Sequence, residues 1–185
     1  MSIIYKGRVF SVEVDRVTLP NGKAHEMAIV RHPPSVVLIP LIDAAHVVLI
    51  RQYRHSLARE IWELPAGSLE SGESAEAAAA RECEEEIALR PGRIERLASF
   101  YPTPGFCDEE LIFFRVSDLR QPPADSPHKP DDDEDIQPQT FSVAEARAMV
   151  ARGEIIDLKT AYGLTLAHPS PPLRIAHGTL VMRPS

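Results

Sequence analysis

The sequence predicts an α+β domain in which strands and hairpins are flanked by a few helices. Two observations carry this prediction. Short β-rich apolar runs recur along the chain, including 36–42, 47–53 and 111–116, and turn-forming glycines and prolines separate them. The segment 74–87 instead has the alanine- and glutamate-rich composition of a helix.

The bulk composition fits one globular domain with or without a small appendage. Of 185 residues, 44% are hydrophobic and 25% are charged. The net charge of −7 argues against nucleic-acid or anionic-membrane surfaces, although bound cations can reverse the field locally. The N-terminus lacks a signal-peptide pattern, no apolar run has membrane-spanning length, and the cysteines, Cys83 and Cys107, suit reduced thiols. We therefore expect a cytoplasmic protein.

Residues 1–33 are expected to form a small antiparallel meander. Apolar and polar residues alternate at 9–14, and Pro20-Asn21-Gly22-Lys23 is a hairpin-turn signal. Pro33-Pro34 breaks the pattern, so a main domain is expected from residue 34 to residue 170. A sheet this small buries no core alone, so it must pack on the main domain or on another chain.

The main domain is expected to begin with a buried hairpin made by 36–42 and 47–53. Ser74 is expected to cap the helix that ends near Ile87. The further strands are expected at 60–64, 96–101 and 111–116.

The last third of the chain predicts an exposed loop and two helices. Residues 121–138 are rich in proline and aspartate and are expected to form the loop. Ser142 to Glu145 forms a capping-box pattern for a helix that stops near Gly153, and Asp157 is expected to cap the last helix. The tail, 171–185, carries no clear pattern.

Glutamates crowd the second half of the 74–87 helix. At 100° per residue, Glu82, Glu85 and Glu86 share one face, and Glu84 points to the other side. Like charges at this spacing repel, and the helix dipole disfavours anions near the C-terminal end. An acidic surface helix is the alternative, but converging carboxylates are the ligands that Mg²⁺ or Mn²⁺ requires.

This spacing resembles the Nudix hydrolase signature, G-x5-E-x7-R-E-U-x-E-E-x-G-U, where U is a bulky apolar residue. Cys83 takes the first apolar position, and Ala88 replaces the second glycine, so Ala88 is strained if φ is positive there. The resemblance implies an α/β/α sandwich around a mixed sheet. The matching positions are Gly67, Glu73, Arg81, Glu82, Glu85, Glu86 and Leu89.

Other segments resemble the ADP-ribose pyrophosphatase branch of this superfamily. They are Arg51 to Arg54, Trp62 to Gly67, Thr103 to Glu109, Asp133 to Ile136 and Gly153 to Asp157. The resemblance implies Mg²⁺-dependent hydrolysis of a nucleoside diphosphate linked to another moiety, with ADP-ribose giving AMP and ribose 5-phosphate. A sugar-nucleotide pyrophosphatase, for example on GDP-mannose, and a non-catalytic nucleotide-sensing domain are the alternatives.

The same resemblance implies two or three Mg²⁺ ions, which Mn²⁺ can replace. Arg81 is expected to orient the glutamates through a bidentate pair, and its alternative is an ordinary surface ion pair. Glu73 either supports the site or is an exposed loop residue. The implied metal ligands are the Ala66 carbonyl and the carboxylates of Glu82, Glu85 and Glu86.

The general base is expected either on the acidic loop or on the helix. The resemblance implies that the base can come from a loop after the signature, and Glu134 is the candidate there, because such a loop can swing over the site. Its neighbours Asp133 and Asp135 can replace it. The alternative for this loop is an ordinary solvated acidic run with no role in the reaction. Glu85, on the helix, is the second candidate for the base.

Several residues are expected at the substrate. Arg51 and Arg54 suit its phosphates, although strand-end salt bridges explain both equally well. Phe106 or Tyr53 can stack on adenine, although core packing is commoner for such side chains. Glu109 can accept a hydrogen bond from a ribose hydroxyl.

The resemblance also implies a partner. ADP-ribose hydrolases of this kind exchange an N-terminal sheet across a two-fold axis, so we expect a homodimer through residues 1–33.

Overall fold

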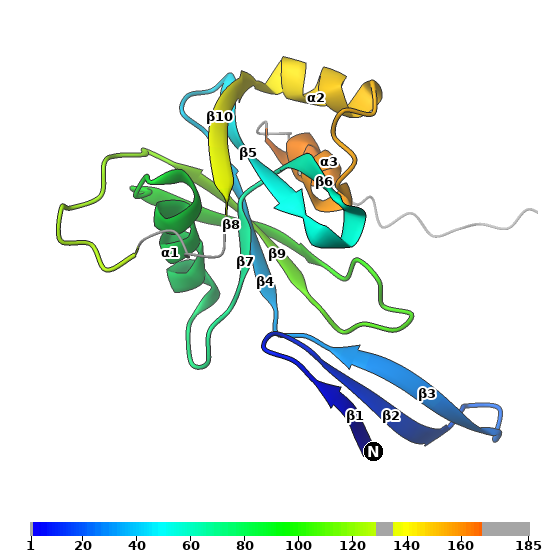
Figure 1. The fold of residues 1–185 in the computed structure, drawn as a ribbon. Coiled ribbons are helices and arrows are strands. Elements are labelled where there is room, and N and C mark those ends of the chain that lie inside the picture. The colour runs from blue at the N-terminus through cyan, green and yellow to red at the C-terminus, as the bar shows by residue number, and fades with distance from the viewer. Residues whose placement is uncertain (1, 129–134, 168–185) are drawn as a thin grey trace, which may run out of the picture.

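The computed structural model describes residues 2–128 and 135–167 of the 185-residue chain (Figure 1). The predicted α+β fold is confirmed, since these residues form three sheets and three α-helices. None of the three helices combines the length and apolar character needed to cross a bilayer.

Two of the sheets lie between helical layers. The first is mixed, in the order β7 (Ala66–Ser68), β4 (Ser35–Pro40), β9 (Leu111–Ser117) and β8 (Arg93–Phe100). The second is antiparallel, in the order β10 (Ile136–Ser142), β5 (His46–Arg54) and β6 (Arg59–Glu63). One core lies on the side of α1 (Ala75–Ile87), and the other includes residues of α2 (Val143–Ala151) and α3 (Leu158–Leu166).

Strand β4 is buried along its whole length because a core covers each of its faces. Val37 and Ile39 pack in the core on the α2 and α3 side, while Val36 and Leu38 pack in the core beneath α1. Side chains alternate between faces along a strand, so an unbroken apolar run fills both cores.

The predicted hairpin between 36–42 and 47–53 is wrong. Strands β4 and β5 belong to different sheets, and an isolated bridge links Leu41, just after β4, to Val47. Instead β4 pairs with β9 in parallel, a partner more than seventy residues later in the chain. The predicted loop 121–138 also ends too late, because its last residues begin β10, which pairs with β5.

The N-terminal residues form the predicted meander of β1 (Ser2–Lys6), β2 (Ser11–Thr18) and β3 (Ala24–Arg31). It projects from one end of the main body (Figure 1). Hydrogen bonds join it to the β8–β9 loop, and they include Val30 N to Phe106 O at 2.7 Å, Asp108 N to Val30 O at 3.2 Å and Arg31 Nη1 to Asp108 Oδ2 at 3.0 Å. Its exposed apolar side chains include Ile3, Ile4, Tyr5, Val9, Phe10 and Met27.

Helix α1 begins and ends as the sequence predicts. The Ser74 hydroxyl accepts a hydrogen bond from Ala77 N at 3.2 Å, so Ser74 is the N-cap. At the other end, Ala88 has φ 55° and ψ 35°, and its N–H donates to Glu84 O at 3.1 Å. Ala88 therefore adopts the left-handed conformation that glycine adopts without strain.

We expect Ala88→Gly to stabilise the protein. The left-handed conformation costs a non-glycine residue about 1–2 kcal/mol, and the greater freedom of an unfolded glycine offsets about 0.5–1 kcal/mol of that. The free energy of unfolding should therefore rise by up to about 1 kcal/mol in urea titrations. The matched control is Ala77→Gly, at an exposed position inside the same helix, which should lower it by about 0.5–1 kcal/mol. Equal losses in both variants would contradict the explanation.

Candidate active site

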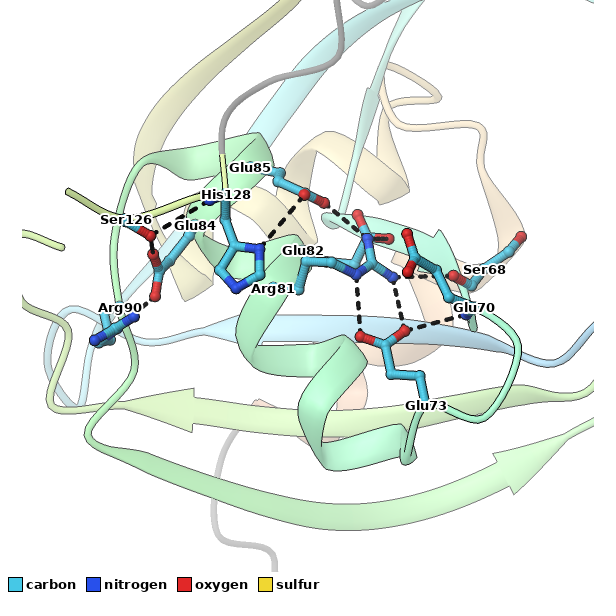
Figure 2. Close-up of polar contacts among 10 residues, drawn as sticks. All are labelled: Ser68, Glu70, Glu73, Arg81, Glu82, Glu84, Glu85, Arg90, Ser126 and His128. Atoms are coloured by element: carbon cyan, nitrogen blue, oxygen red, sulfur yellow. Dashed lines mark hydrogen bonds and ion pairs between the residues drawn. The ribbon is translucent and has the colours of Figure 1, made fainter. Parts of the chain in front are cut away.

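Arg81 lies at the centre of the candidate site (Figure 2). Its Nε and Nη2 atoms bind the two carboxylate oxygens of Glu73 at 3.1 and 3.0 Å, and Nη2 also donates to Ser68 O at 3.1 Å. Its Nη1 atom donates to Glu82 Oε1 and to Glu85 Oε2, both at 2.7 Å. These five contacts match the five N–H donors of a guanidinium. The bidentate pair therefore forms with Glu73, and Arg81 reaches the other two glutamates through one nitrogen.

Glu73 holds Arg81 in place. Its side chain is 15% exposed, and Oε2 also accepts a hydrogen bond from Glu70 N at 3.1 Å. Burial raises the pKa of Glu73, but the hydrogen bonds from Arg81 and Glu70 outweigh it and keep that pKa below the ordinary value. The geometry favours the supporting role over an exposed loop position.

Glu82 lies directly against the backbone of Gly67 in β7. A Cβ atom at Gly67 would be 1.8 Å from Glu82 Oε1 and 2.0 Å from Glu82 Cδ. The residue is 7% exposed. Gly67 is therefore required for the close approach of strand and carboxylate, rather than for an unusual backbone conformation.

Glu86 contacts Ala66, the residue before Gly67 in β7. Its Oε2 atom accepts a hydrogen bond from Ala66 N at 2.8 Å, and the residue is 5% exposed. Strand β7 and one face of α1 thus bring together Ala66, Glu82, Glu85 and Glu86, the four expected ligands.

The donor chemistry of this group fits a divalent cation. Glu82 and Glu85 pair with the Arg81 guanidinium, and Glu86 accepts a hydrogen bond from Ala66 N. Such hard oxygen donors suit Mg²⁺ and Mn²⁺. Within residues 2–128 and 135–167, no three His, Cys, Asp or Glu side chains already converge at metal-binding distance.

Two adjoining cavities open at this group. The first, of about 540 Å³, is bordered by Arg81, Glu82 and Glu85 and also by Arg8 and Arg54. The second, of about 370 Å³, is bordered by Arg54 and Glu109 and reaches the start of α3. Residues 66–68 and Arg54 line both cavities, so the two form one cleft beside β7.

Arg54 is both a strand-end salt bridge and part of the cleft wall. Its Nε and Nη2 atoms bind Glu63 Oε1 and Oε2 at 2.5 and 2.8 Å. Glu63, which is 1% exposed, also accepts a hydrogen bond from Lys159 Nζ. Burial raises the pKa of Glu63, but Arg54 and Lys159 together hold that pKa below its ordinary value. The Arg54 side chain remains 38% exposed, so it can contact a ligand in the cleft.

The Glu63 pair predicts a pH dependence of stability. Because the folded-state pKa of Glu63 is lowered, its stabilising contribution is present above the unfolded value of 4.5 and is lost as pH falls through the folded-state value. Glu63→Gln should lower the free energy of unfolding by about 3 kcal/mol at pH 7, and the difference should shrink below pH 4.5. Urea titrations from pH 3 to pH 7 measure it, and a constant difference would contradict the assignment.

The remaining substrate candidates separate into two groups. Glu109 lines the 370 Å³ cavity and accepts a hydrogen bond from Ser35 Oγ at 2.9 Å. Arg51 instead pairs with Glu60 at 2.7 Å, and its guanidinium lies 5.9 Å from the Trp62 ring centre. Arg51 lines neither cavity of the cleft, and nor does Phe106.

The aromatic candidates are not core residues. Phe106 is 56% exposed and Tyr53 is 52% exposed. Side chains this exposed do not pack in the core, so the core-packing alternative is wrong for both residues.

The other face of α1 holds part of the 121–138 loop. Glu84, which is 3% exposed, accepts hydrogen bonds from Arg90 Nε and Ser126 Oγ, both at 2.5 Å. Nearby, His128 Nδ1 lies 3.8 Å from Glu85 Oε1 (Figure 2). Burial raises the pKa of Glu84, but the bonds from Ser126 and Arg90 bring it below the ordinary value. The sequence carried no signal for this contact, which joins residues 42 positions apart.

Of the three loop candidates for the base, Glu134 and Asp133 lie outside the described residues, and Asp135 is exposed and lines neither cavity of the cleft. Glu85, the second candidate, lies in the wall of the 540 Å³ cavity. Its side chain is 20% exposed.

The chain is similar to known proteins over most of its length. A family model described as NUDIX domain matches residues 31–159. The chain is 35% identical over 161 residues to the ADP-ribose pyrophosphatase of Bacillus subtilis, covering 87% of this chain and 86% of the relative. It is 31% identical over 166 residues to the ADP-ribose pyrophosphatase of Mycobacterium tuberculosis, covering 89% and 79%.

Two further proteins are similar to this chain, one in sequence and one in fold. The methanol dehydrogenase activator of Bacillus methanolicus is 36% identical over 157 residues, covering 85% of this chain and 84% of the relative. A crystal structure of an ADP compounds hydrolase shares the fold with a TM-score of 0.73 at 20% identity, covering 89% of this chain and 88% of that chain. Nudix enzymes generally use divalent metal ions, in agreement with the carboxylate group on α1. The chain therefore belongs to the Nudix family, in its ADP-ribose pyrophosphatase-like branch, and is a Nudix pyrophosphatase.

Proposed function

We propose that the protein hydrolyses the diphosphate bond of ADP-ribose and releases AMP and ribose 5-phosphate. The observation that carries this proposal is one cleft with Glu82 and Glu85 in its wall and Arg54 between its two cavities. Anionic phosphates need positive charge on both sides, which Arg54 and carboxylate-bound cations supply. Two relatives named ADP-ribose pyrophosphatase support this choice of substrate.

We propose Mg²⁺ as the cofactor, with two or three ions held by Glu82, Glu85, Glu86 and the Ala66 carbonyl. Bound divalent ions neutralise the phosphates, lower the pKa of a water ligand and stabilise the leaving oxygen. Arg81 fixes the carboxylates before substrate arrives, so they need little reorganisation.

We assign substrate contacts to Arg54 and Glu109 because both line the cleft. Arg54 orients a phosphate, and Glu109 accepts a hydrogen bond from a ribose hydroxyl. Glu134 remains our candidate for the general base, and Glu85 is the alternative.

A substrate panel tests the proposal. We expect ADP-ribose to have the highest kcat/KM among ADP-ribose, GDP-mannose and other sugar nucleotides, with AMP and ribose 5-phosphate as products. Chelation of divalent ions should abolish turnover, and Mg²⁺ or Mn²⁺ should restore it. A higher kcat/KM for GDP-mannose would identify a sugar-nucleotide pyrophosphatase instead. Tight ADP-ribose binding without hydrolysis in either metal would identify a nucleotide sensor.

We further propose a homodimer formed through residues 1–33. The meander carries exposed Ile3, Ile4 and Tyr5 on its first strand, an apolar surface that a second copy would cover. Light scattering at micromolar concentration should give twice the chain mass of 20.5 kDa. Ile4→Asp should shift that mass to the monomer, and a monomeric wild-type protein would refute the proposal.

We propose a cytoplasmic location for this enzyme. Cys83 and Cys107 are both free thiols, the usual state in a reducing compartment.

A further inference from the structure

Part of the loop between β9 and β10 is fixed to the flank of α1, next to the carboxylates of the cleft (Figure 2). Glu84 Oε1 accepts a hydrogen bond from Arg90 Nε, and Glu84 Oε2 accepts one from Ser126 Oγ, both at 2.5 Å. Two residues further along the loop, His128 Nδ1 lies 3.8 Å from Glu85 Oε1. The loop therefore meets α1 at two successive residues, of which the second lies in the wall of the cleft.

Glu84 is an unfavourable residue for the helix itself. Its side chain is 2% exposed, although burial of a charge is costly. The dipole of α1 also disfavours an anion this close to its C-terminal end. The two partners of its carboxylate, Arg90 and Ser126, lie beyond the helix, and hydrogen bonds to an ionised group are the strong ones. The buried carboxylate thus serves to hold the loop on α1.

This anchor fixes the position of His128. Only Pro127 separates Ser126 from His128, and the proline ring fixes its own φ and restricts the residue before it. The backbone N–H of His128 also donates to Ser126 Oγ at 3.4 Å. The imidazole is consequently kept near Glu85 while Ser126 is bound to Glu84.

Glu85 has a nitrogen-bearing side chain beside each of its carboxylate oxygens. Its Oε2 atom accepts a hydrogen bond from Arg81 Nη1 at 2.7 Å, while Oε1 faces His128 Nδ1. The separation of 3.8 Å is longer than a hydrogen bond, but such contacts are often long in a resting active site and shorten in the complex with substrate. His128 lines neither cavity of the cleft, so its effect on the reaction passes through Glu85.

We propose that His128 is a positioning residue that orients the Glu85 carboxylate, and that the bond between Glu84 and Ser126 is the anchor that places it there. This inference rests on the proposed function, which makes Glu85 a ligand of the cation. Groups that orient a metal ligand from outside are worth about 10–100-fold in metal affinity or activity. A neutral imidazole that donates from Nδ1 suffices for this role, so the inference does not depend on a charge on His128.

Three variants and one control test the role of His128. His128→Ala removes the ring, and Ser126→Ala removes the anchor while His128 remains. His128→Asn restores an uncharged N–H donor close to the position of Nδ1. The control is Asp125→Ala, which truncates an exposed side chain of the same loop. Circular dichroism verifies that each variant is folded.

We expect His128→Ala to lower kcat for ADP-ribose hydrolysis about tenfold and to leave KM near the wild-type value. Calorimetry without substrate should show that the dissociation constant of Mn²⁺ also rises about tenfold. His128→Asn should recover most of both losses, and Asp125→Ala should match the wild type.

Three results would overturn the positioning role. The first is a wild-type kcat and Mn²⁺ affinity in His128→Ala. The second is a raised KM with a wild-type kcat, which would place His128 at the substrate instead. The third is a loss in His128→Asn equal to that in His128→Ala, which would show that an uncharged donor does not suffice.

A double variant tests the anchor. Because Ser126 acts through His128, Ser126→Ala should reproduce the losses of His128→Ala, and the two substitutions together should be no worse than His128→Ala alone. Additive losses would show that Ser126 acts independently, and would overturn the anchor.

The same measurements separate this inference from the proposed function. A wild type that binds Mn²⁺ but leaves ADP-ribose intact would refute the proposed activity, while a weakened Mn²⁺ affinity in His128→Ala would still support the positioning role. A wild type that hydrolyses ADP-ribose, with unchanged kinetics and Mn²⁺ affinity in His128→Ala, would refute the positioning role alone. A wild type that binds no divalent ion would refute both.

Discussion

Glu82→Gln and Glu86→Gln are each expected to lower kcat for ADP-ribose hydrolysis by about two to three orders of magnitude. Glutamine keeps the size of the side chain but removes the charge that holds a divalent ion. Glu82 lies against Gly67 of β7, and Glu86 lies against Ala66 of the same strand. Each substitution therefore removes a charge where α1 meets β7. Steady-state rates with saturating Mg²⁺ measure the effect, and circular dichroism verifies that each variant is folded.

The matched control is Glu76→Gln, which removes a carboxylate from the exposed first turn of the same helix. It should leave kcat unchanged. Near-wild-type rates in both the Glu82 and Glu86 variants would refute the metal assignment. Calorimetry that detected no uptake of Mg²⁺ or Mn²⁺, with or without nucleotide, would refute it independently.

Gly67→Ala is expected to lower kcat by about 100-fold, with little change in the free energy of unfolding. The new Cβ atom would overlap the carboxylate of Glu82, which is the mobile end of a side chain, so the carboxylate moves and the fold remains. Kinetic assays and urea titrations on the same preparation separate the two effects. A wild-type kcat would mean that the position of Glu82 against β7 does not matter.

Gly163→Ala provides the contrast. A Cβ atom there would lie 2.4 Å from Leu64 Cδ1, a buried atom in the core. We expect this variant to lose about 1–3 kcal/mol of stability, because the surrounding side chains must repack. The pair of glycines thus distinguishes crowding at the site from crowding in the core.

Local patterns correctly predicted α1 and the shared face of Glu82, Glu85 and Glu86. Capping by Ser74 and the 100° spacing depend only on neighbouring residues, and both were available from sequence. The pairing of β4 was not available from sequence. A strand that is buried on both faces has no alternation of polar and apolar residues that could identify its neighbours.

The strand period also explains why only one of the two arginines expected at the substrate lines the cleft. Arg51 and Arg54 are three positions apart on β5, so they point to opposite faces, and Arg54 alone of the two reaches the cleft. The Glu84–Ser126 contact had no comparable signal, since it depends on how a proline-rich loop folds back across α1.

Arg81 has a consequence for the protein when divalent ions are scarce. Its guanidinium binds the carboxylates of Glu73, Glu82 and Glu85 and offsets one of their three negative charges, which reduces their mutual repulsion. We therefore expect the chain to fold without divalent ions. A chelated enzyme should remain folded while it is inactive, with a melting temperature lowered only by the lost binding free energy of the ions, and should recover activity when ions return.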